Sequence, residues 1–421
     1  MGAFSRDVLT LPNRARLVFD PMPGLRTTAL GVWLGAGARY ERANENGLAH
    51  FLEHMAFKSA GGQNALQIAE FVESRGAVMN AATDYERTSY TMRCLEGDAA
   101  DMLNVALSLV FAPDHPENEI EREKGVVLQE IGESSDQPDD LVFELSQAAA
   151  YGDHPLGRPI LGTQQTLQGI KRSNLFEFAE ANYAPARTVI SVTGAFDKSA
   201  IEDVVRKWMD GRQEREAPAV EPAHSPAARW HAEARDVEQC HLVLSRPAPA
   251  STSDDRFAAR LFAEIFGGGM ASRLFQQVRE ERGLAYTIDA TCDQYSDAGR
   301  LTVYAGCAPE DAMDVAKITA SIWGDLASAG PTREELARAK AVMKAQFAMS
   351  AEAPAMRAGS AAYELLTFDR LIEIEEILDR IDAVDRADVQ RIAGEAVAGV
   401  ASAAAVGPRA GLGVAEAFLS L

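Results

Sequence analysis

The sequence has few of the residues that crosslink a protein or anchor it in a membrane. Only four of its 421 residues are cysteines, and no two of them form a Cys-x-x-Cys pair. This excludes a disulfide framework and a cysteine zinc site, and it favours a reducing compartment. No apolar run reaches the roughly 18 residues of a membrane helix. The N-terminus also lacks the pattern of a secretory signal. We therefore expect a cytoplasmic protein with no membrane partner.

Positive charge is also scarce. The chain has 41 Lys and Arg against 62 Asp and Glu, which gives a formal net charge of −21. Such an acidic surface repels phosphate backbones, so we expect no nucleic-acid partner. Long-range attraction of basic peptides is one interpretation of this charge. The other is that the excess carboxylates only keep the protein soluble.

The length and the order of the patterns predict a duplication. A chain of 421 residues is too long for one ordinary core, so two domains are expected. Alternating strand patterns and helical periodicities in the first half recur in the same order about one domain length later. We predict an α+β fold of two similar duplicated domains, each a mainly antiparallel sheet packed with helices, which together form a clamp. The predicted parts are residues 1–212, a proline-containing linker 213–227, and residues 228–421.

We predict the secondary-structure elements from the spacing of apolar residues and from the turn and capping residues between the segments. In the first half we expect strands at 14–19, 28–34, 77–82, 88–94 and 188–193, and helices at 65–74, 97–109, 116–132 and 198–210. In the second half we expect strands at 241–245, 284–292 and 300–307, and helices at 256–266 and 272–282.

One short helical segment carries metal-binding chemistry. His50 and His54 are four residues apart, so a helix places both imidazoles on one face, one turn apart. Neutral imidazoles in this arrangement can share one Zn²⁺. Glu53 lies beside them and could act as general base without being a ligand. The order His-x-x-Glu-His is the inverted zincin signature, although a surface helix can contain these letters by chance.

A catalytic zinc site needs a third protein ligand, and a later helical segment offers candidates. Glu123 and Glu130 are seven residues apart and therefore share a helix face. Glu130 has apolar neighbours, and a buried carboxylate there would need a partner such as a metal. Glu123 could hydrogen-bond a ligand histidine. On spacing alone, two solvated helix glutamates explain the pattern equally well.

These motifs resemble the pitrilysin-type (inverzincin) metallopeptidases, and most closely the mitochondrial processing peptidase β subunit and its bacterial homologues. The resemblance covers nearly the whole chain. Its most specific stretches are Gly47-Leu-Ala-His-Phe-Leu-Glu-His-Met-Ala-Phe-Lys58, Glu121-Arg-Glu-Lys-Gly-Val-Val-Leu-Gln-Glu-Ile131 and Leu156-Gly-Arg-Pro-Ile-Leu-Gly162.

The resemblance implies one Zn²⁺ per chain, with Glu130 as its third ligand beside the two histidines. Glu123 matches the accessory glutamate of that family. Asn80 and Ala81 match the start of the strand that lines the bound substrate, and the edge of this strand would bind peptide by strand addition.

The second half departs from the metal motif. Residues 260–264, which match the His50–His54 stretch, read Arg-Leu-Phe-Ala-Glu and cannot bind zinc in the same way. The family instead supplies an arginine and a tyrosine from this half. Arg279 and Tyr286 match that pair, with an implied role in binding the substrate backbone and stabilising the oxyanion. Taken alone, Arg279 could be an ordinary arginine on a helix surface and Tyr286 an ordinary tyrosine in a strand.

The predicted function is a zinc metalloendopeptidase that acts on peptides, with presequence-like or basic peptides as candidate substrates. The alternative is a non-catalytic structural or partner subunit of the same family. Completeness of the site favours the enzyme, because all of the motif residues are present. Both halves of the site occur in one chain, so we expect a homodimer, with a self-sufficient monomer as the alternative.

Overall fold

The computed structural model describes residues 6–215, 218–223 and 228–421. It divides into two compact units, each assembled from three segments of the chain. Unit 1 contains residues up to 131, 159–220 and 349–372, and unit 2 contains residues 132–158, 221–348 and 373–421. The predicted boundaries 1–212 and 228–421 and the clamp arrangement stay predictions. Residues 216, 217 and 224–227 of the predicted linker 213–227 lie outside the described residues.

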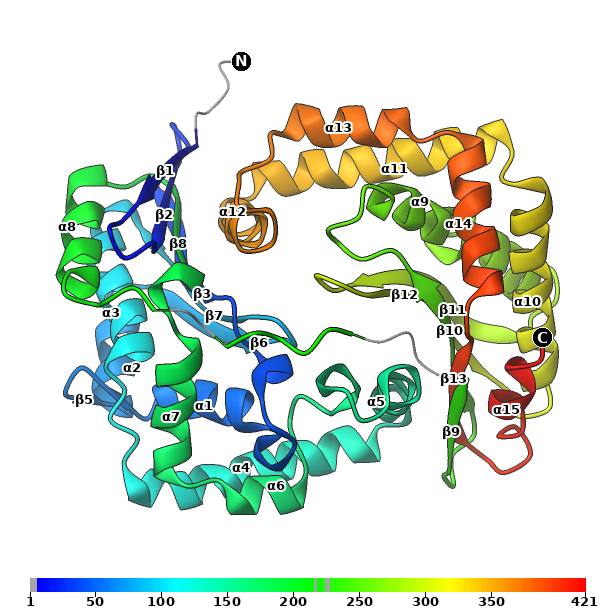
Figure 1. The fold of residues 1–421 in the computed structure, drawn as a ribbon, viewed down its shortest axis with the longest axis horizontal. Helices are drawn as coiled ribbons and strands as arrows, with labels where there is room; N and C mark the ends of the chain where they lie inside the picture. The colour runs from blue at the N-terminus through cyan, green and yellow to red at the C-terminus, as the bar shows by residue number, and fades with distance from the viewer. Residues whose placement is uncertain (1–5, 216–217, 224–227) are drawn as a thin grey trace. The chain divides into compact units, whose positions relative to one another are not determined.

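Unit 1 is built on a six-stranded sheet in the order β1-β2-β8-β3-β7-β6. All neighbouring strands are antiparallel except β2 and β8. This leaves β6 at one edge of the sheet (Figure 1). The strands are β1 (Asp7–Thr10), β2 (Arg16–Pro21), β3 (Thr27–Leu34), β6 (Val78–Thr83), β7 (Thr88–Leu95) and β8 (Thr188–Gly194), and a small separate hairpin is formed by β4 (Ser59–Ala60) and β5 (Gln63–Asn64).

Unit 2 repeats this topology with the order β11-β12-β10-β13-β9. Its single parallel pair, β13 with β9, corresponds to β8 with β2, and the other pairs are antiparallel in both sheets. The matching order supports the predicted duplication, and the α+β class with mainly antiparallel sheets is confirmed. The strands are β9 (Arg229–Ala234), β10 (Cys240–Ala248), β11 (Ala285–Gln294), β12 (Gly299–Cys307) and β13 (Ser402–Gly407).

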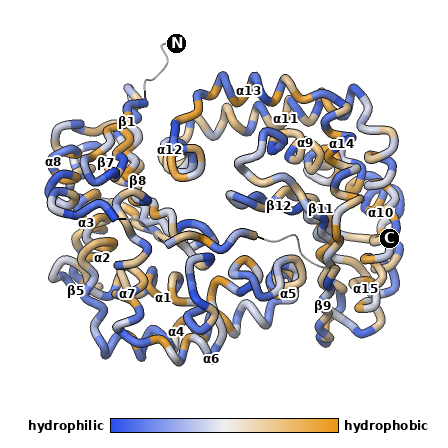
Figure 2. Tube along the Cα trace, in the orientation of Figure 1, coloured by the Kyte–Doolittle hydropathy of each residue, from blue (hydrophilic) through white to orange (hydrophobic). Residues whose placement is uncertain are grey.

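Helices cover both faces of each sheet. Figure 2 shows hydrophilic and hydrophobic residues alternating along helices such as α5 and α13, as in amphipathic helices. The helices of unit 1 are α1 (Leu48–Ala56), α2 (Ala65–Glu73), α3 (Ala99–Phe111), most of α4 (Glu117–Asp136), α6 (Gln164–Gly169), α7 (Arg172–Asn182), α8 (Lys198–Met209) and α12 (Pro354–Phe368). Those of unit 2 are α5 (Pro138–Tyr151), α9 (Arg256–Gly267), a π-helix (Phe275–Glu280), α10 (Ala312–Ala329), most of α11 (Arg333–Glu352), α13 (Ile374–Ala383), α14 (Arg386–Ala398) and α15 (Val414–Phe418).

One helix of each half of the sequence belongs to the other unit. Helix α12 comes from the second half, yet it packs on β2, β3 and β8 of unit 1. Helix α5 comes from the first half and packs on β9, β10 and β13 of unit 2. Side chains alternate along β3, so the two faces of the sheet contact different apolar clusters. Val32 and Leu34 belong to the large core of unit 1, whereas Trp33 belongs to a smaller cluster against α12.

Two expected elements differ from the structure. The strand expected at 14–19 begins only at Arg16, because Arg14 has a φ of 69° in a turn where the Arg14 amide donates to the Leu11 carbonyl. The helix expected at 272–282 is mainly π-helical. Its Glu281 amide donates to the carbonyl of Gln276, five residues back, at 2.9 Å.

Within the described residues, no helix combines the length and the apolar character needed to cross a bilayer.

Candidate metal centre

Helix α1 carries the motif, and its start is fixed by a buried carboxylate. Glu41 is 4% exposed and accepts hydrogen bonds from the amides of Gly47 at 2.9 Å and Ala49 at 2.6 Å. These amides belong to the first turn of the helix, where no backbone carbonyl is available to them. The carboxylate therefore satisfies them and places the helix start.

Gly47 is required because another backbone segment crosses the helix at this point. Its φ is 92°, and a Cβ there would lie 2.6 Å from the carbonyl oxygen of Leu161. A Cβ on Gly162 would lie 2.5 Å from the carbonyl oxygen of Asn46. The two glycines thus allow a close contact between the segment before α1 and the segment that ends at Gly162.

The apolar stripe of α1 is buried as expected. Leu48, Phe51, Leu52 and Met55 are each at most 2% exposed and belong to the large core of unit 1. The imidazoles therefore lie on the opposite side of the helix, as the spacing predicts.

The structure brings His50, His54 and Glu130 together. One ligand atom from each lies within 4.8 Å of the others. Glu130 Oε2 lies 3.6 Å from His54 Nε2 and 3.9 Å from His50 Nε2. Two ligands at about 2.1 Å from a tetrahedral zinc ion are separated by about 3.4 Å, so these spacings suit one ion.

The unpaired oxygen of Glu130 and the types of the ligands also fit a metal ion. Glu130 Oε2 is buried and has no hydrogen-bond partner among the described residues. A buried carboxylate oxygen without a partner is costly, and a cation between it and the two imidazoles would compensate for this. Nitrogen and carboxylate ligands in this number are typical of catalytic zinc sites, which keep one position open.

Glu130 is less buried than its apolar sequence neighbours predict. Its side chain is 36% exposed, and only the Oε2 atom is buried. The carboxylate is thus neither fully buried nor fully solvated. The helix surface that carries Glu130 therefore reaches solvent.

Glu123 holds the ring of His54. This carboxylate is 3% exposed, and its Oε1 accepts a hydrogen bond from His54 Nδ1 at 2.9 Å. Its Oε2 forms an ion pair with Lys58 Nζ at 2.5 Å. A carboxylate accepts only from a protonated nitrogen, so Nδ1 carries the hydrogen. In the neutral ring the lone pair of Nε2 then faces Glu130.

Burial affects the protonation of His50. It lowers the pKa of this imidazole to about 4, with a smaller contribution from His54. The ring is therefore neutral at physiological pH, which is the state that binds a metal.

Glu53 lies one residue before His54 but has a separate environment. It is 9% exposed, and the hydroxyl of Thr83 donates to its Oε2 at 2.5 Å. Burial raises the pKa of this carboxyl, and the hydrogen bond from Thr83 opposes the shift. A raised carboxyl pKa brings a general base closer to the pH at which it works.

Asn80 and Ala81 lie on β6, the edge strand of the sheet of unit 1. Their backbones pair with Thr91 and Tyr90 of β7 on one side. The other side of β6 has no partner strand among the described residues. Helix α1 packs on β6, so this edge and the candidate metal centre belong to neighbouring elements.

Arg279 and Tyr286 belong to unit 2, and the structure brings them together there. The Arg279 guanidinium lies 5.1 Å from the centre of the Tyr286 ring and 4.8 Å from that of Phe275. Tyr286 is 76% exposed, and Arg279 lies on the π-helix. Their contact with substrate stays a prediction.

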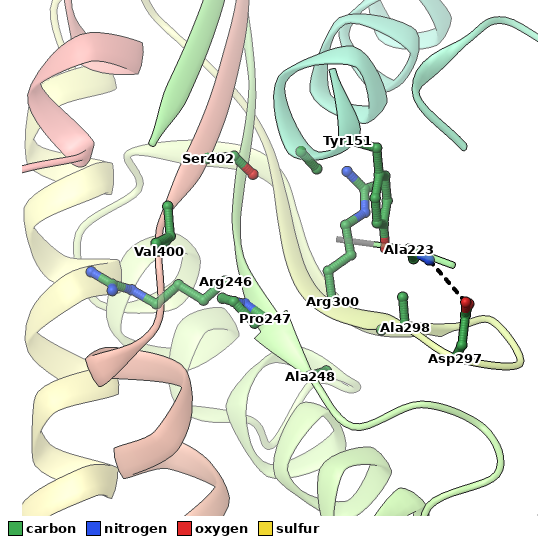
Figure 3. Close-up of a pocket in the computed structure, with 12 residues that line it drawn as sticks. Tyr151, Ala223, Arg246, Pro247, Ala248, Asp297, Ala298, Arg300, Val400 and Ser402 are labelled. Carbon is green, nitrogen blue, oxygen red and sulfur yellow. Dashed lines mark hydrogen bonds between the residues drawn. The ribbon is translucent and has the colours of Figure 1, made fainter. Parts of the chain in front are cut away.

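A separate pocket of unit 2 is lined by the ends of β10, β12 and β13 (Figure 3). Arg300 points toward the ring of Tyr151 and donates to the hydroxyl of Ser146 at 2.9 Å. Arg246 points away and donates to the carbonyl of Val397 at 3.0 Å. Both guanidinium groups are thus held by oxygens of the protein, and the lining of this pocket contains none of the predicted site residues.

Comparison with known proteins identifies the family. Residues 18–164 match the model described as Insulinase (Peptidase family M16), and residues 169–343 match Peptidase M16 inactive domain. The chain is 33% identical over 404 residues to an uncharacterized zinc protease of Mycobacterium tuberculosis, which covers 95% of this chain and 92% of the relative. The chain belongs to peptidase family M16.

The chain is also similar to a further zinc protease and, in fold, to two solved structures. An uncharacterized zinc protease of Bacillus subtilis is 34% identical over 385 residues, or 91% of this chain and 94% of the relative. The fold resembles a protease from Helicobacter pylori with a TM-score of 0.88 at 22% identity, covering 96% of this chain and 99% of that chain. It also resembles a structure named peptidase M16 inactive domain from Pseudomonas fluorescens, with a TM-score of 0.87 at 21% identity and coverages of 96% and 98%.

Sequence reasoning did not find three residues that shape this M16 site. Lys58 lies four residues after His54, so helical spacing could have indicated it. Glu41 and Thr83 carry no such signal. Glu41 acts from a loop before the helix, and Thr83 reaches Glu53 from a strand 30 residues later.

Proposed function

We propose that this M16 chain is a zinc-dependent endopeptidase with one zinc ion held by His50, His54 and Glu130. The observation that carries the proposal is the convergence of these three ligands beside a buried glutamate that is not a ligand. The names of the relatives as zinc proteases support the same conclusion.

The roles of the residues follow from their contacts. When bound, zinc lowers the pKa of a coordinated water and polarises the scissile carbonyl. Thr83 occupies Oε2 of Glu53, so we assign proton transfer to Oε1. Glu53 would take the proton from the attacking water and deliver it to the leaving amine. Glu123 would keep His54 in the tautomer that binds the metal.

The open edge of β6 is the proposed binding site for the substrate backbone. An extended peptide can add to such an edge through main-chain hydrogen bonds, with Asn80 and Ala81 on the receiving strand. Arg279 and Tyr286 are proposed as further contacts to the substrate backbone and the oxyanion. The net charge of −21 favours basic or presequence-like peptides as substrates, as expected of a processing peptidase.

The rival function is a non-catalytic subunit. In unit 2 the residues that match the motif, 260–264 on α9, contain no histidine, in agreement with the inactive-domain model that matches this region. Unit 1 retains both histidines, Glu53, Glu123 and Glu130. This complete set favours the enzyme.

The decisive test is Glu53→Gln. The substitution keeps the shape of the side chain but removes the proton acceptor, so zinc content should be unchanged and cleavage should fall by about 100-fold or more. Metal analysis and mass spectrometry of a digested peptide mixture would measure both quantities. Glu70→Gln, at an exposed glutamate of α2, is the matched control. Wild-type cleavage by the Glu53→Gln protein would refute the assignment.

A further inference from the structure

A second cavity, in unit 1, lies beside β6, the strand proposed to receive the substrate, where α12 faces the hairpin of β6 and β7. Its volume is about 220 Å³, and its lining includes Trp33, Ala82, Arg87, Gly359 and Tyr363. A cavity of roughly 150 Å³ can hold a benzene ring, so this one has room for a large side chain.

The cavity opens on the face of the sheet opposite the candidate metal centre. Ala81 packs against the large core of unit 1, the core that contains α1. Ala82, the next residue of β6, lines the cavity. Trp33 of β3 also turns to this face, in the cluster with α12. Successive side chains of a strand point to opposite faces, so the side chain of Ala82 points away from the face that carries Ala81. Thr83, at the end of β6, borders the cavity and also donates to Glu53.

The chemistry of the lining indicates the kind of group that it would accept. Its two charges are already engaged, since Arg87 Nε lies 3.3 Å from Asp84 Oδ2. The Arg87 guanidinium also lies 4.7 Å from the centre of the Tyr363 ring. Besides this charged pair, the lining consists of the Trp33 and Tyr363 rings, Ala82, Gly359 and the small polar residues Thr83 and Ser89. Such a surface favours a large apolar or aromatic group over a charged one.

We propose that this cavity is a specificity subsite that binds a large apolar or aromatic side chain of the substrate. The proposal rests on the proposed function, because it requires a peptide added along the open edge of β6. The side chains of such a peptide alternate between the two faces of the sheet. When one residue faces the metal side, its neighbours point to the side of the cavity. The enzyme would therefore prefer a large side chain at one position of the peptide. This position lies an odd number of residues away from any position whose side chain faces the metal side.

Gly359 provides a way to fill the cavity without disturbing the fold. It lies inside α12, and a Cβ built on it meets no heavy atom within 4 Å. A larger residue at this helical position also has a better helix propensity than glycine. Gly359→Phe should therefore occupy the cavity with its own ring. Gly359→Ala should leave the cavity open.

The test measures binding in the full-length chain carrying Glu53→Gln, so that bound peptides stay intact. The probes are fluorescently labelled polyalanine-based peptides in which a single Phe is moved one position at a time. One Phe position should bind at least about tenfold more tightly than the peptide without Phe. Gly359→Phe should abolish this gain, so that the peptide with Phe at this position and the peptide without Phe bind alike. Gly359→Ala should retain the gain, and so should Gly324→Phe, a control at an exposed helical glycine of unit 2 with equally open surroundings.

Equal binding of all Phe peptides, or a preference that Gly359→Phe leaves intact, would overturn the subsite. Cleavage of the same peptides by the chain with Glu53 separates the two proposals. Zinc-dependent cleavage without any preference for Phe would refute the subsite alone. A Gly359-dependent preference in binding without cleavage would support the subsite and refute the peptidase.

Discussion

Glu123 determines which nitrogen of His54 is available to a metal. Its Oε2 is held by Lys58 at 2.5 Å, so its Oε1 is directed at His54 Nδ1 at 2.9 Å. Both contacts are made by a carboxylate that is 3% exposed. The buried position excludes competing water, so the orientation of the imidazole depends on this one side chain.

Glu123→Gln should therefore weaken zinc binding by roughly 10- to 100-fold. If Lys58 retains the amide oxygen, the amide NH₂ faces His54 Nδ1 and favours the tautomer with a hydrogen on Nε2. Competition with a chromophoric chelator would measure the dissociation constant. Glu121→Gln, on the same helix with a side chain that is 77% exposed, should leave it unchanged. Equal affinity in Glu123→Gln and the wild type would contradict this account.

Sequence spacing predicted the part of the site that lies on single helices. His50 and His54 share a face of α1, and Glu123 and Glu130 share a face of α4. Spacing alone could not show that these two helices meet, because the contact depends on tertiary packing. It also could not show that Glu130 is partly exposed or that Thr83 contacts Glu53.

At the scale of elements, α12 is held to the sheet of unit 1 by a buried ion pair. Asp20 of β2 is fully buried, and its two oxygens accept hydrogen bonds from Arg357 Nε and Nη2, each at 2.7 Å. The bidentate geometry compensates for the burial of both charges. The helix also covers Trp33 and its apolar neighbours on that face.

Arg357→Ala should lower the free energy of unfolding by about 3–5 kcal/mol, because Asp20 would remain buried without its partner. Urea unfolding followed by circular dichroism would measure the change. Lys198→Ala removes a pair in which both side chains are more than half exposed, and its effect should stay below about 1 kcal/mol. Similar values for the two variants would show that the Asp20 pair does not stabilise α12 on the sheet.

The limits of sequence interpretation at this scale are also physical. Strand alternation and helix periodicity predicted most segments, since each pattern reports the burial of one face. The π-helix at Phe275–Glu280 has the same apolar residues as an ordinary helix and differs only in its hydrogen bonds. The turn at Arg14 requires a positive φ, and an arginine in the sequence does not predict this conformation.

At the scale of the whole chain, each sheet is covered by one helix from the other half of the sequence. The duplicated order of strands could be predicted from the sequence, whereas this exchange of helices could not. Helices α5 and α12 are amphipathic segments whose patterns fit either sheet. Leu141 and Val142 of α5 pack with Val243 of β10 in unit 2, although α5 lies about 100 residues before that strand.

The separate halves 1–212 and 228–421 should therefore not fold independently. Each would lack the helix that covers one face of its sheet, leaving apolar groups such as Trp33 or Val243 exposed. We expect each half alone to aggregate and the two together to form a one-to-one complex. Size-exclusion chromatography and thermal melting would show this. A monomeric first half with a cooperative transition like that of the full chain would contradict it.

The exchanged helices also bear on how such a gene can evolve. After a duplication, a copy that has lost its catalytic residues is ordinarily free to decay or to be deleted. Here the second copy supplies α12 to the sheet of unit 1. Deleting it would remove the cover of the sheet whose unit retains the histidines. Selection on the unit that retains the histidines would thus preserve the other unit, while positions of the other unit that match the motif, such as Arg260 to Glu264, would remain free to change.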